Sequence, residues 1–259
     1  MVVAARDEAD RIAATLAGLA DAFPGAGVWV ADDGSTDATV AIAEAAGARV
    51  VGVAGRAGRR RGGKGQAMTL GVRAAFAGSG SQNEGAACTY ARARWPIFDR
   101  SLDFEDPLAS LDRSEAEPVL VLCDADLGES ARELGPLVDA VRNGEADLAI
   151  AAFSTRAGGG LGLALAFARW AVRRRCGLSL RAPLSGQRAL RMGVLEDLVP
   201  FAGGYGMEIG MTIDAVRAGH EVTEVELALN HRPTGRQLAG FLHRARQLAS
   251  FVRVYVARR

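Results

Sequence analysis

One stretch of the sequence decides the fold: Val119-Leu120-Val121-Leu122-Cys123, followed at once by Asp124-Ala125-Asp126. The first part is continuously apolar, which is typical of a strand buried on both faces at the centre of a parallel sheet. Ligands of open α/β sheets bind beyond the carboxyl ends of the strands. The stretch therefore predicts a parallel sheet and places two carboxylates at the edge where a site is expected.

Outward from this strand, short apolar runs alternate with segments of helical periodicity. Strands are expected at residues 2–5, 28–31, 49–53, 119–123, 147–151 and 221–229. Helices are expected between them, among others at residues 66–77, 163–175 and 207–217. Such alternation is typical of βαβ units. The predicted fold class is α/β, a Rossmann-like and mainly parallel sheet flanked by helices.

Composition sets the outer limits. The chain has 259 residues, of which 49% are hydrophobic and 24% charged, a profile of globular proteins. We expect one domain over residues 1–259, because a chain of this length can bury a full core. No apolar run reaches the roughly 18 residues that cross a bilayer. The cysteines, Cys88, Cys123 and Cys176, are far apart and form neither a disulfide framework nor a CxxC site, which favours a reducing cytoplasm.

Two segments differ from the rest. Residues 78–118 are polar, with mixed charge and aromatic residues without a clear period, and are interpreted as an insertion or flap. Residues 237–259 predict a basic amphipathic C-terminal helix, and no acid follows Glu226. Such a helix either lies on an anionic membrane or packs its apolar stripe on its own domain. The sequence leaves both alternatives open.

Acidic residues follow three of the expected strands: Glu8, the pair Asp32 and Asp33, and the pair Asp124 and Asp126. Any one of them alone could be a helix cap or a turn former. Carboxylates gathered at one edge repel each other unless a cation neutralises them or hydrogen-bond donors stabilise them. An Asp-x-Asp turn can hold Mg²⁺ together with substrate phosphates, and such a metal neutralises a leaving diphosphate.

Basic groups are expected at the same edge. Gly62-Gly63-Lys64-Gly65 opens a helix, and a glycine-rich helix N-terminus can bind anions. Gly58 to Lys64 fits GxxxxGK, but Gly65 stands where a P-loop needs Ser or Thr, which excludes a P-loop NTPase. A flexible basic loop is the alternative. His231 follows the last expected strand and is either a metal ligand or a structural histidine.

At this point the sequence resembles glycosyltransferase family 2. The motifs that carry the resemblance occur in family order and cover nearly the whole chain except residues 78–118. They are Ala4-Ala5-Arg6-Asp7-Glu8, Asp32-Asp33-Gly34-Ser35-Thr36-Asp37, Gly63-Lys64-Gly65, Asp124-Ala125-Asp126 and Ser185-Gly186-x-Arg188-Ala189. The segment Gly204-Tyr205-Gly206-x-Glu208 is shared with glucosyl-3-phosphoglycerate synthases, and Ser-Gly-x-Arg-Ala with polyprenyl-phosphate sugar transferases. The resemblance implies a GT-A fold and transfer of a sugar from a nucleotide diphosphate sugar.

The resemblance also implies residue roles. Donor contacts are implied for Ala5, Glu8, Asp33, Lys64 and Asp124. Acceptor contacts are implied for Ser185, Gly186, Tyr205, Gly206 and Arg232. Asp126 and His231 would bind the metal cofactor, Mg²⁺ or Mn²⁺. Glu208 stands where the family carries its catalytic carboxylate, and it is a base for the acceptor, a group that orients sugar hydroxyls, or an acid favoured at a helix N-terminus.

The predicted function is a metal-dependent hexosyltransferase (EC 2.4 class) that uses a UDP- or GDP-sugar. Its acceptor would be a polyprenyl phosphate or a small phosphate-bearing metabolite. The alternatives are a retaining glucosyl-3-phosphoglycerate synthase-like enzyme and a catalytically degenerate membrane or partner adaptor. A nucleotidyltransferase is disfavoured because no Gly-rich loop follows the first strand, and a receiver domain because Asp124 comes too late. We expect a cytoplasmic protein without a nucleic-acid partner; membrane contact at the cytoplasmic face and a homodimer remain open.

Overall fold

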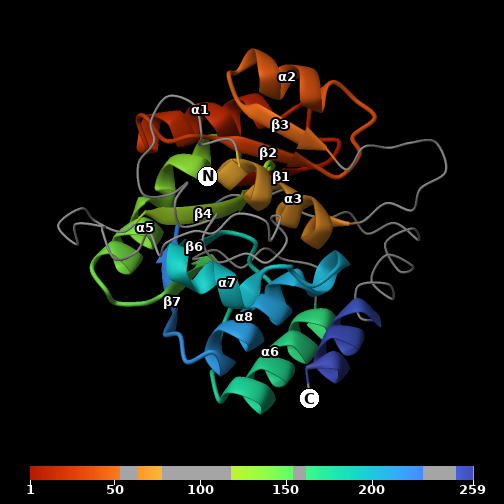
Figure 1. Ribbon diagram of the computed structural model, residues 1–259, viewed down its shortest axis with the longest axis vertical. Helices are drawn as coiled ribbons and strands as arrows, with labels where there is room; N and C mark the ends of the chain where they lie inside the picture. The colour runs from red at the N-terminus through yellow and green to blue at the C-terminus, as the bar shows by residue number, and fades with distance from the viewer. Residues whose placement is uncertain (53–62, 78–117, 154–161, 230–248, 259) are drawn as a thin grey trace, which may run out of the picture.

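The computed structural model describes residues 1–52, 63–77, 118–153, 162–229 and 249–258 (Figure 1). These residues form a seven-stranded sheet in the order β3-β2-β1-β4-β6-β5-β7. The strands are β1 (Val2–Ala5), β2 (Trp29–Asp32), β3 (Arg49–Gly52), β4 (Val119–Asp124), β5 (Leu148–Phe153), β6 (Arg188–Arg191) and β7 (Val222–Leu227). The six expected strands are therefore present, with ends that differ by at most two residues.

One strand of the sheet was not expected. β6 lies between β4 and β5 and is antiparallel to both, with Arg188 opposite Leu122 of β4 and Ile150 of β5. All other pairings in the described sheet are parallel. Because β6 runs the other way, its first residue lies at the edge where β4 ends. The turn before β6 is thereby brought to the carboxyl edge of the central strand.

Helices cover both faces of the sheet. They are α1 (Ile12–Ala22), α2 (Thr39–Ala45), α3 (Lys64–Ala77), α5 (Gly135–Arg142), α6 (Gly162–Cys176), α7 (Leu195–Leu198) and α8 (Met207–Arg217), with 3₁₀ turns η3 (Gly128–Leu134), η4 (Met192–Val194) and η5 (Gly204–Gly206). The expected helix after Asp126 thus begins as the 3₁₀ turn η3. The mainly parallel sheet flanked by helices confirms the predicted α/β class.

Strand alternation explains the two covered faces. Successive strand residues point to opposite faces, so Val3 joins the core with α1, η3 and α5, whereas Val2 joins the core with α3, α7 and α8. Val2 and Val3 are both fully buried. The central strand β4 likewise contributes to both cores, as its uninterrupted apolar run predicts.

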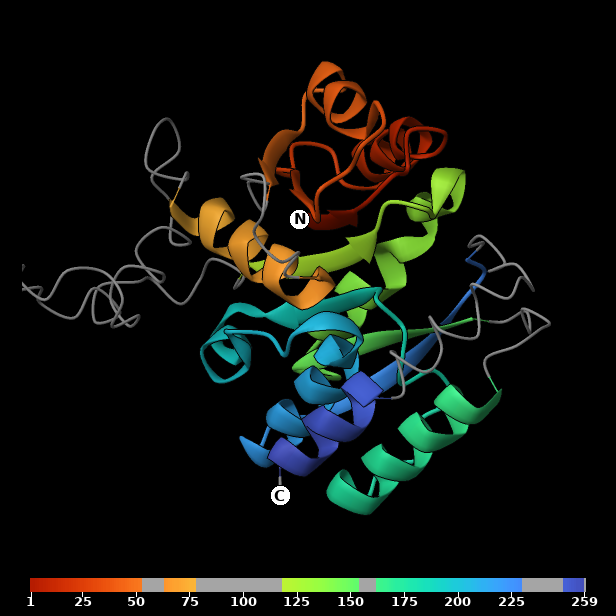
Figure 2. The same cartoon turned by 90° about the vertical axis from the view of Figure 1, so that its right-hand side faces the viewer.

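A further layer lies outside α8. There α6 packs against α8 and against a C-terminal helix over residues 249–257, and the shared apolar cluster includes Ile209, Ile213 and Phe251. Figure 2 shows this layer at the end of the molecule farthest from α1 and α2. The rest of the predicted C-terminal helix, and residues 78–117 of the predicted insertion, lie outside the described residues.

Within the described ranges, none of the helices is both long and apolar enough to cross a membrane.

Candidate active site

The centre of the candidate site is Lys64, the first residue of α3. Its Nζ lies 2.6 Å from Oδ1 of Asp124 and 2.9 Å from Oε1 of Glu208. Asp124 ends the central strand β4, and Glu208 lies in the first turn of α8. Three elements that are distant in the sequence therefore meet through one ammonium group.

The turn before β6 also contacts Asp124 and Lys64. Gln187 donates from Nε2 to Oδ2 of Asp124 at 3.0 Å and accepts at Oε1 from the Ser185 hydroxyl at 3.0 Å. Ser185 and Gln187 are both buried. Gly186 lies between them, and a Cβ on it would collide with Asp124 Oδ2 and Lys64 Nζ. The turn passes directly over the Lys64–Asp124 ion pair, so a larger residue at this position would have to displace one of these two side chains.

A buried arginine holds that turn. Arg188 is 1% exposed and donates from its guanidinium to the carbonyls of Ser185 and Pro183 and to the hydroxyl of Thr212. The Thr212 hydroxyl in turn donates to the carbonyl of Glu208. Arg188 thus ties the turn before β6 to the first part of α8, the two segments that carry the candidate acceptor residues and Glu208.

The buried charges of the site balance. Burial alone would lower the pKa of Lys64, but the carboxylates of Asp124 and Glu208 outweigh it and raise that pKa above its ordinary value. Burial lowers the pKa of Arg188 to about 10, with Glu208 acting in the opposite direction. Lys64 therefore pairs directly with both carboxylates, and Arg188 interacts with them only at longer range. Asp124, one of the acids that we expected to repel each other, is stabilised together with Glu208 by the lysine that we expected to bind phosphate.

A second part of the site lies at the ends of β1 and β2. Asp33 is 8% exposed. Its main-chain N–H donates to the carbonyl of Ala5, and its Oδ1 accepts from the N–H of Gly63 at 3.0 Å. Arg6 Nη1 lies 3.6 Å from Asp33 Oδ2. Asp33 therefore connects the first two strand ends to the residue that precedes Lys64.

Other acids of this region accept hydrogen bonds from their own turn or from the neighbouring loop. Asp32 accepts from the amides of Gly34 and Ser35. Asp7, which has a positive φ of 52°, accepts from the amide of Thr36, and this bond lowers its pKa. Asp37 accepts from the hydroxyl and the amide of Thr39, and these bonds lower its pKa as well. These three carboxylates hold the loops in shape.

The Asp-x-Asp turn is anchored to α1 through its main chain. The carbonyl of Ala125 accepts from Thr15, and the carbonyl of Asp126 accepts from Arg11 at 2.8 Å. Neither bond uses the Asp126 carboxylate. Glu8 lies nearby in the chain's first loop, and its N–H donates to Thr39. Among the described residues, no three His, Cys, Asp or Glu side chains come together as a metal site.

The remaining predicted site residues divide into two groups. Tyr205 and Gly206 lie in η5, just before Glu208, and Gly206 lies against Val254 of the C-terminal helix. His231 and Arg232 lie outside the described residues. The structure therefore brings together Lys64, Asp124, Ser185, Gly186 and Glu208, and it connects Ala5 and Asp33 to them through Gly63.

Comparisons with known proteins bear on the family and the fold of the chain. The model of glycosyl transferase family 2 matches residues 1–77. The chain is also similar to solved structures of glucosyl-3-phosphoglycerate synthase from Mycobacterium tuberculosis. The complex with phosphoglyceric acid has 26% identity and a TM-score of 0.68, over 99% of this chain and 78% of that one. The resemblance to family 2 glycosyltransferases is confirmed. With it, the expectation of a GT-A fold and of a glycosyltransferase is confirmed too.

Two further structures of that glycosyltransferase are similar at the same level. One contains Mn²⁺, UDP and glucosyl-3-phosphoglycerate, with 25% identity, a TM-score of 0.66 and coverage of 99% of this chain and 78% of that one. The other contains Mg²⁺ and UDP, with 25% identity, a TM-score of 0.66 and coverage of 99% and 77%. No curated protein sequence matches the chain.

Sequence reasoning missed the roles of Gln187 and Arg188. Both lie in a motif that was noticed, Ser185-Gly186-x-Arg188-Ala189, but neither was given a function. The local sequence gives no signal for the burial of Arg188, because a buried arginine needs hydrogen-bond partners and these come together only in the folded chain.

Proposed function

We propose that the chain is a metal-dependent glycosyltransferase that moves a sugar from a nucleoside diphosphate sugar to a phosphate-bearing acceptor. The observation that carries this proposal is the ammonium of Lys64 between Asp124 and Glu208, beneath Gly186. A cation fixed at this point can pair with the diphosphate of a donor. It would stabilise the negative charge that develops on the departing nucleotide.

On the donor side, Ala5, Glu8 and Asp33 would contact the nucleoside. Asp33 supports this role because it is buried and fixed by the N–H of Gly63, so that its position is set before a donor binds. Asp124 would contact the ribose while it holds Lys64. A uridine nucleotide is the first choice, since the similar synthase binds UDP; GDP is the alternative.

The proposed cofactor is Mg²⁺ or Mn²⁺, as in the similar synthase. Asp126 and His231 would hold it, because carboxylate oxygen and imidazole nitrogen are both suitable ligands for Mn²⁺. Since the described residues contain no three-ligand group, donor phosphate oxygens would supply further ligands. When bound, the ion neutralises charge on the leaving diphosphate.

On the acceptor side, Ser185, Gly186, Tyr205, Gly206 and Arg232 would bind the acceptor, with Glu208 as the catalytic carboxylate. The acceptor decides what Glu208 does. A hydroxyl acceptor such as that of phosphoglycerate needs a base near its proton. A polyprenyl phosphate is already anionic, and Glu208 would then orient sugar hydroxyls. We place 3-phosphoglycerate first, because the similar synthase is solved with phosphoglyceric acid, and polyprenyl phosphate second.

The proposal covers residues 1–259 as one domain in the cytoplasm. The two described cysteines are free thiols. Burial raises the pKa of Cys123 to about 12, so this thiol stays protonated and unreactive. A homodimer and contact with the cytoplasmic face of a membrane are compatible with the proposal and are not required by it.

The testing experiment has two parts. Thermal unfolding is measured with UDP and GDP, with and without Mn²⁺, for the native chain and for Asp126→Ala. A nucleotide present at 100 times its Kd stabilises the folded protein by about 2.7 kcal/mol. We expect this stabilisation from one of the two nucleotides, and only when Mn²⁺ is present. UDP-glucose is then offered with 3-phosphoglycerate or short polyprenyl phosphates, and the glycosylated product is measured by mass spectrometry. The proposal fails if neither nucleotide stabilises the chain and Asp126→Ala changes nothing.

A further inference from the structure

The outer layer of the molecule carries an exposed surface of mixed character, which we name the arginine–tryptophan face. On α6, Leu163 is 83% exposed and Trp170 is 51% exposed; on the C-terminal helix, Val252 is 41% and Val256 is 45% exposed. Exposed arginines lie on the same two helices: Arg173, Arg174 and Arg253. Large apolar groups exposed together on a monomer are unusual and indicate a contact surface.

Ring contacts hold the two helices side by side. The rings of Trp170 and Tyr255 lie 5.0 Å apart between centroids, and Phe167 lies 5.6 Å from Trp170 and 6.1 Å from Tyr255. The guanidinium of Arg175 lies 4.2 Å from the centre of the Tyr255 ring. These contacts join the two helices around Trp170 and Tyr255.

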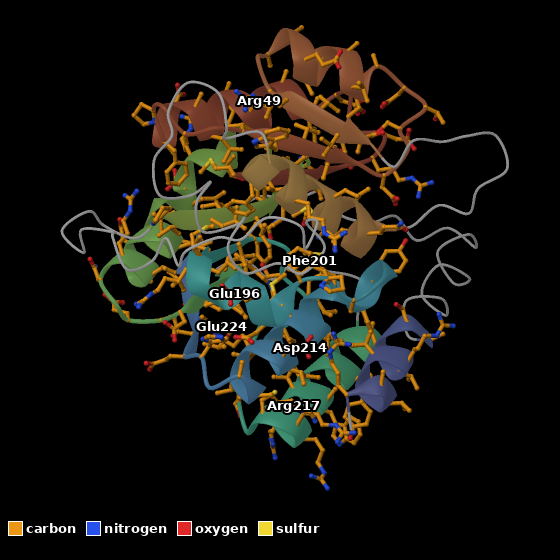
Figure 3. The ribbon with its side chains drawn as sticks, in the orientation of Figure 1. Arg49, Glu196, Phe201, Asp214, Arg217 and Glu224 are labelled. Atoms are coloured by element: carbon orange, nitrogen blue, oxygen red, sulfur yellow. The ribbon has the colours of Figure 1, made fainter. Side chains whose placement is uncertain are left out.

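The C-terminal helix packs on the domain and also presents an outer side. Phe251 is 3% and Val254 is 6% exposed, so this part of its apolar stripe is buried. Arg258 pairs with Asp214 of α8 through both oxygens, at 2.6 and 2.5 Å; Figure 3 shows Asp214 on α8. Packing therefore accounts for the inner side of the helix, and Val252, Arg253 and Val256 on the outer side need another explanation.

The charge of the face has one sign. The segment Gly162–Cys176 contains four arginines and no acid, and residues 249–258 contain two arginines and no acid. Arg258 is used by Asp214 and Arg169 donates to the carbonyl of Arg181. Within the described ranges, Arg173, Arg174 and Arg253 form no ion pair. Their charge is thus available for an anionic partner.

We propose that the arginine–tryptophan face binds the surface of an anionic membrane. Tryptophan and tyrosine rings favour the membrane–water interface, and arginine side chains reach from an apolar surface to headgroup phosphates. The exposed aliphatic groups Leu163 and Val256 argue for lipid rather than nucleic acid, because a phosphate backbone offers them no apolar contact. A second copy of the chain would place arginines against arginines, which repel.

The face lies next to the candidate active site without being part of it. Residues 249–254 contact η5, where Ser250 donates to the carbonyl of Gly203 and Val254 lies against Gly206. Glu208 follows directly in α8. Membrane binding by this face would therefore hold the N-terminal end of α8 near the lipid surface. The binding itself does not depend on the proposed glycosyl transfer and is tested separately from it.

The test is flotation of the full-length chain with vesicles of phosphatidylcholine, with or without phosphatidylglycerol. We expect binding to the anionic vesicles only, and weaker binding as salt is added. The double variant Arg173→Glu/Arg174→Glu should bind at least about tenfold more weakly, because each arginine near an anionic surface contributes about a factor of five. The matched control is Arg132→Glu/Arg142→Glu, which makes the same charge change on η3 and α5, on the other side of the sheet, and should bind like the native chain.

Leu163→Glu tests the apolar part. It should reduce binding that persists at high salt, while unfolding curves confirm that each variant is folded. Absence of binding to phosphatidylglycerol vesicles, or equal binding by the face variant and its control, would overturn the proposal. A dimer in light scattering that Leu163→Glu dissociates would overturn it too, because the occupant would then be a second copy.

Discussion

Two sets of acids lie at the same edge of the sheet and are satisfied in different ways. Asp7, Asp32 and Asp37 accept hydrogen bonds from amides and hydroxyls of neighbouring loops. Asp124 and Glu208 share the ammonium of Lys64. The first set is fixed by the backbone and cannot be released without unfolding the loops. The second depends on one long side chain that can turn to a phosphate. An acid that is paired with a long side chain can therefore exchange that partner for a substrate group, whereas an acid that is held by the backbone keeps a fixed position.

The largest effect should come from Glu208→Gln. This change keeps the shape of the side chain and removes its charge, and it should lower sugar transfer by about 10²- to 10⁴-fold if Glu208 is the catalytic base. The measurement is the rate of product formation at saturating donor and acceptor. Glu145→Gln, at the opposite edge of the sheet, is the matched change and should leave the rate unaltered. A variant of Glu208 with native activity would place that carboxylate among the structural acids.

The next effect concerns stability. Lys64→Met removes the ammonium and leaves Asp124 and Glu208 close together without their cation. Breaking a fully buried ion pair costs about 3 kcal/mol, and this pair is partly buried, so a loss of about 2 kcal/mol is expected. Chemical denaturation measures the loss in free energy of unfolding. Arg132→Met likewise removes one positive charge, here from an exposed ion pair with Glu129. It should lower the free energy of unfolding by less than about 1 kcal/mol. Equal losses in the two variants would contradict the distinction between the two sets of acids.

A smaller effect on activity should follow from Gly186→Ala. The added methyl group would push Lys64 and Asp124 apart. Because both contacts are to flexible side-chain ends, the protein should stay folded while transfer falls by about tenfold, as expected for misplaced reacting groups. Gly203→Ala is the control, since its Cβ would meet no atom within 4 Å. Unchanged transfer by Gly186→Ala would show that the Lys64–Asp124 geometry is not needed.

The smallest effect should be seen with Asp37→Asn. The pKa of Asp37 is lowered below its ordinary value of 3.8 by its bonds to Thr39. A group with a lowered folded-state pKa stabilises the protein above its unfolded-state pKa, and this contribution is lost as the pH falls through the folded-state value. The native chain should therefore lose stability slightly more steeply on acidification than Asp37→Asn. Melting temperatures across the acidic range measure the two slopes; parallel slopes would contradict the assignment.

Much of this fold could be predicted from the sequence, and one strand shows why not all of it could. β4 is recognisable because five consecutive apolar residues are typical of a strand that is buried on both faces. β6 reads Arg-Ala-Leu-Arg and has no such pattern. Arg188 is buried only because the carbonyls of Pro183 and Ser185 and the hydroxyl of Thr212 accept hydrogen bonds from its guanidinium. Those partners come together in the folded chain and leave no local signal.

The candidate site shows the same limit. Lys64, Asp124 and Glu208 were each predicted as site residues, from a glycine-rich turn, a strand end and a family motif. Their mutual contact was not predicted, because it depends on how α3, β4 and α8 approach one another. Of the two predicted metal ligands, Asp126 lies in a turn whose main chain is anchored to α1. The role of His231 stays a prediction.

Gly65, the residue after Lys64, separates this loop from the P-loops of nucleotide-hydrolysing proteins. Any Cβ on Gly65 would run into the carbonyl of Ala202, so the serine or threonine that nucleotide-hydrolysing loops place there has no room. Resemblance between the two loops is therefore superficial. No single substitution could convert one into the other, because the neighbouring segment would first have to withdraw.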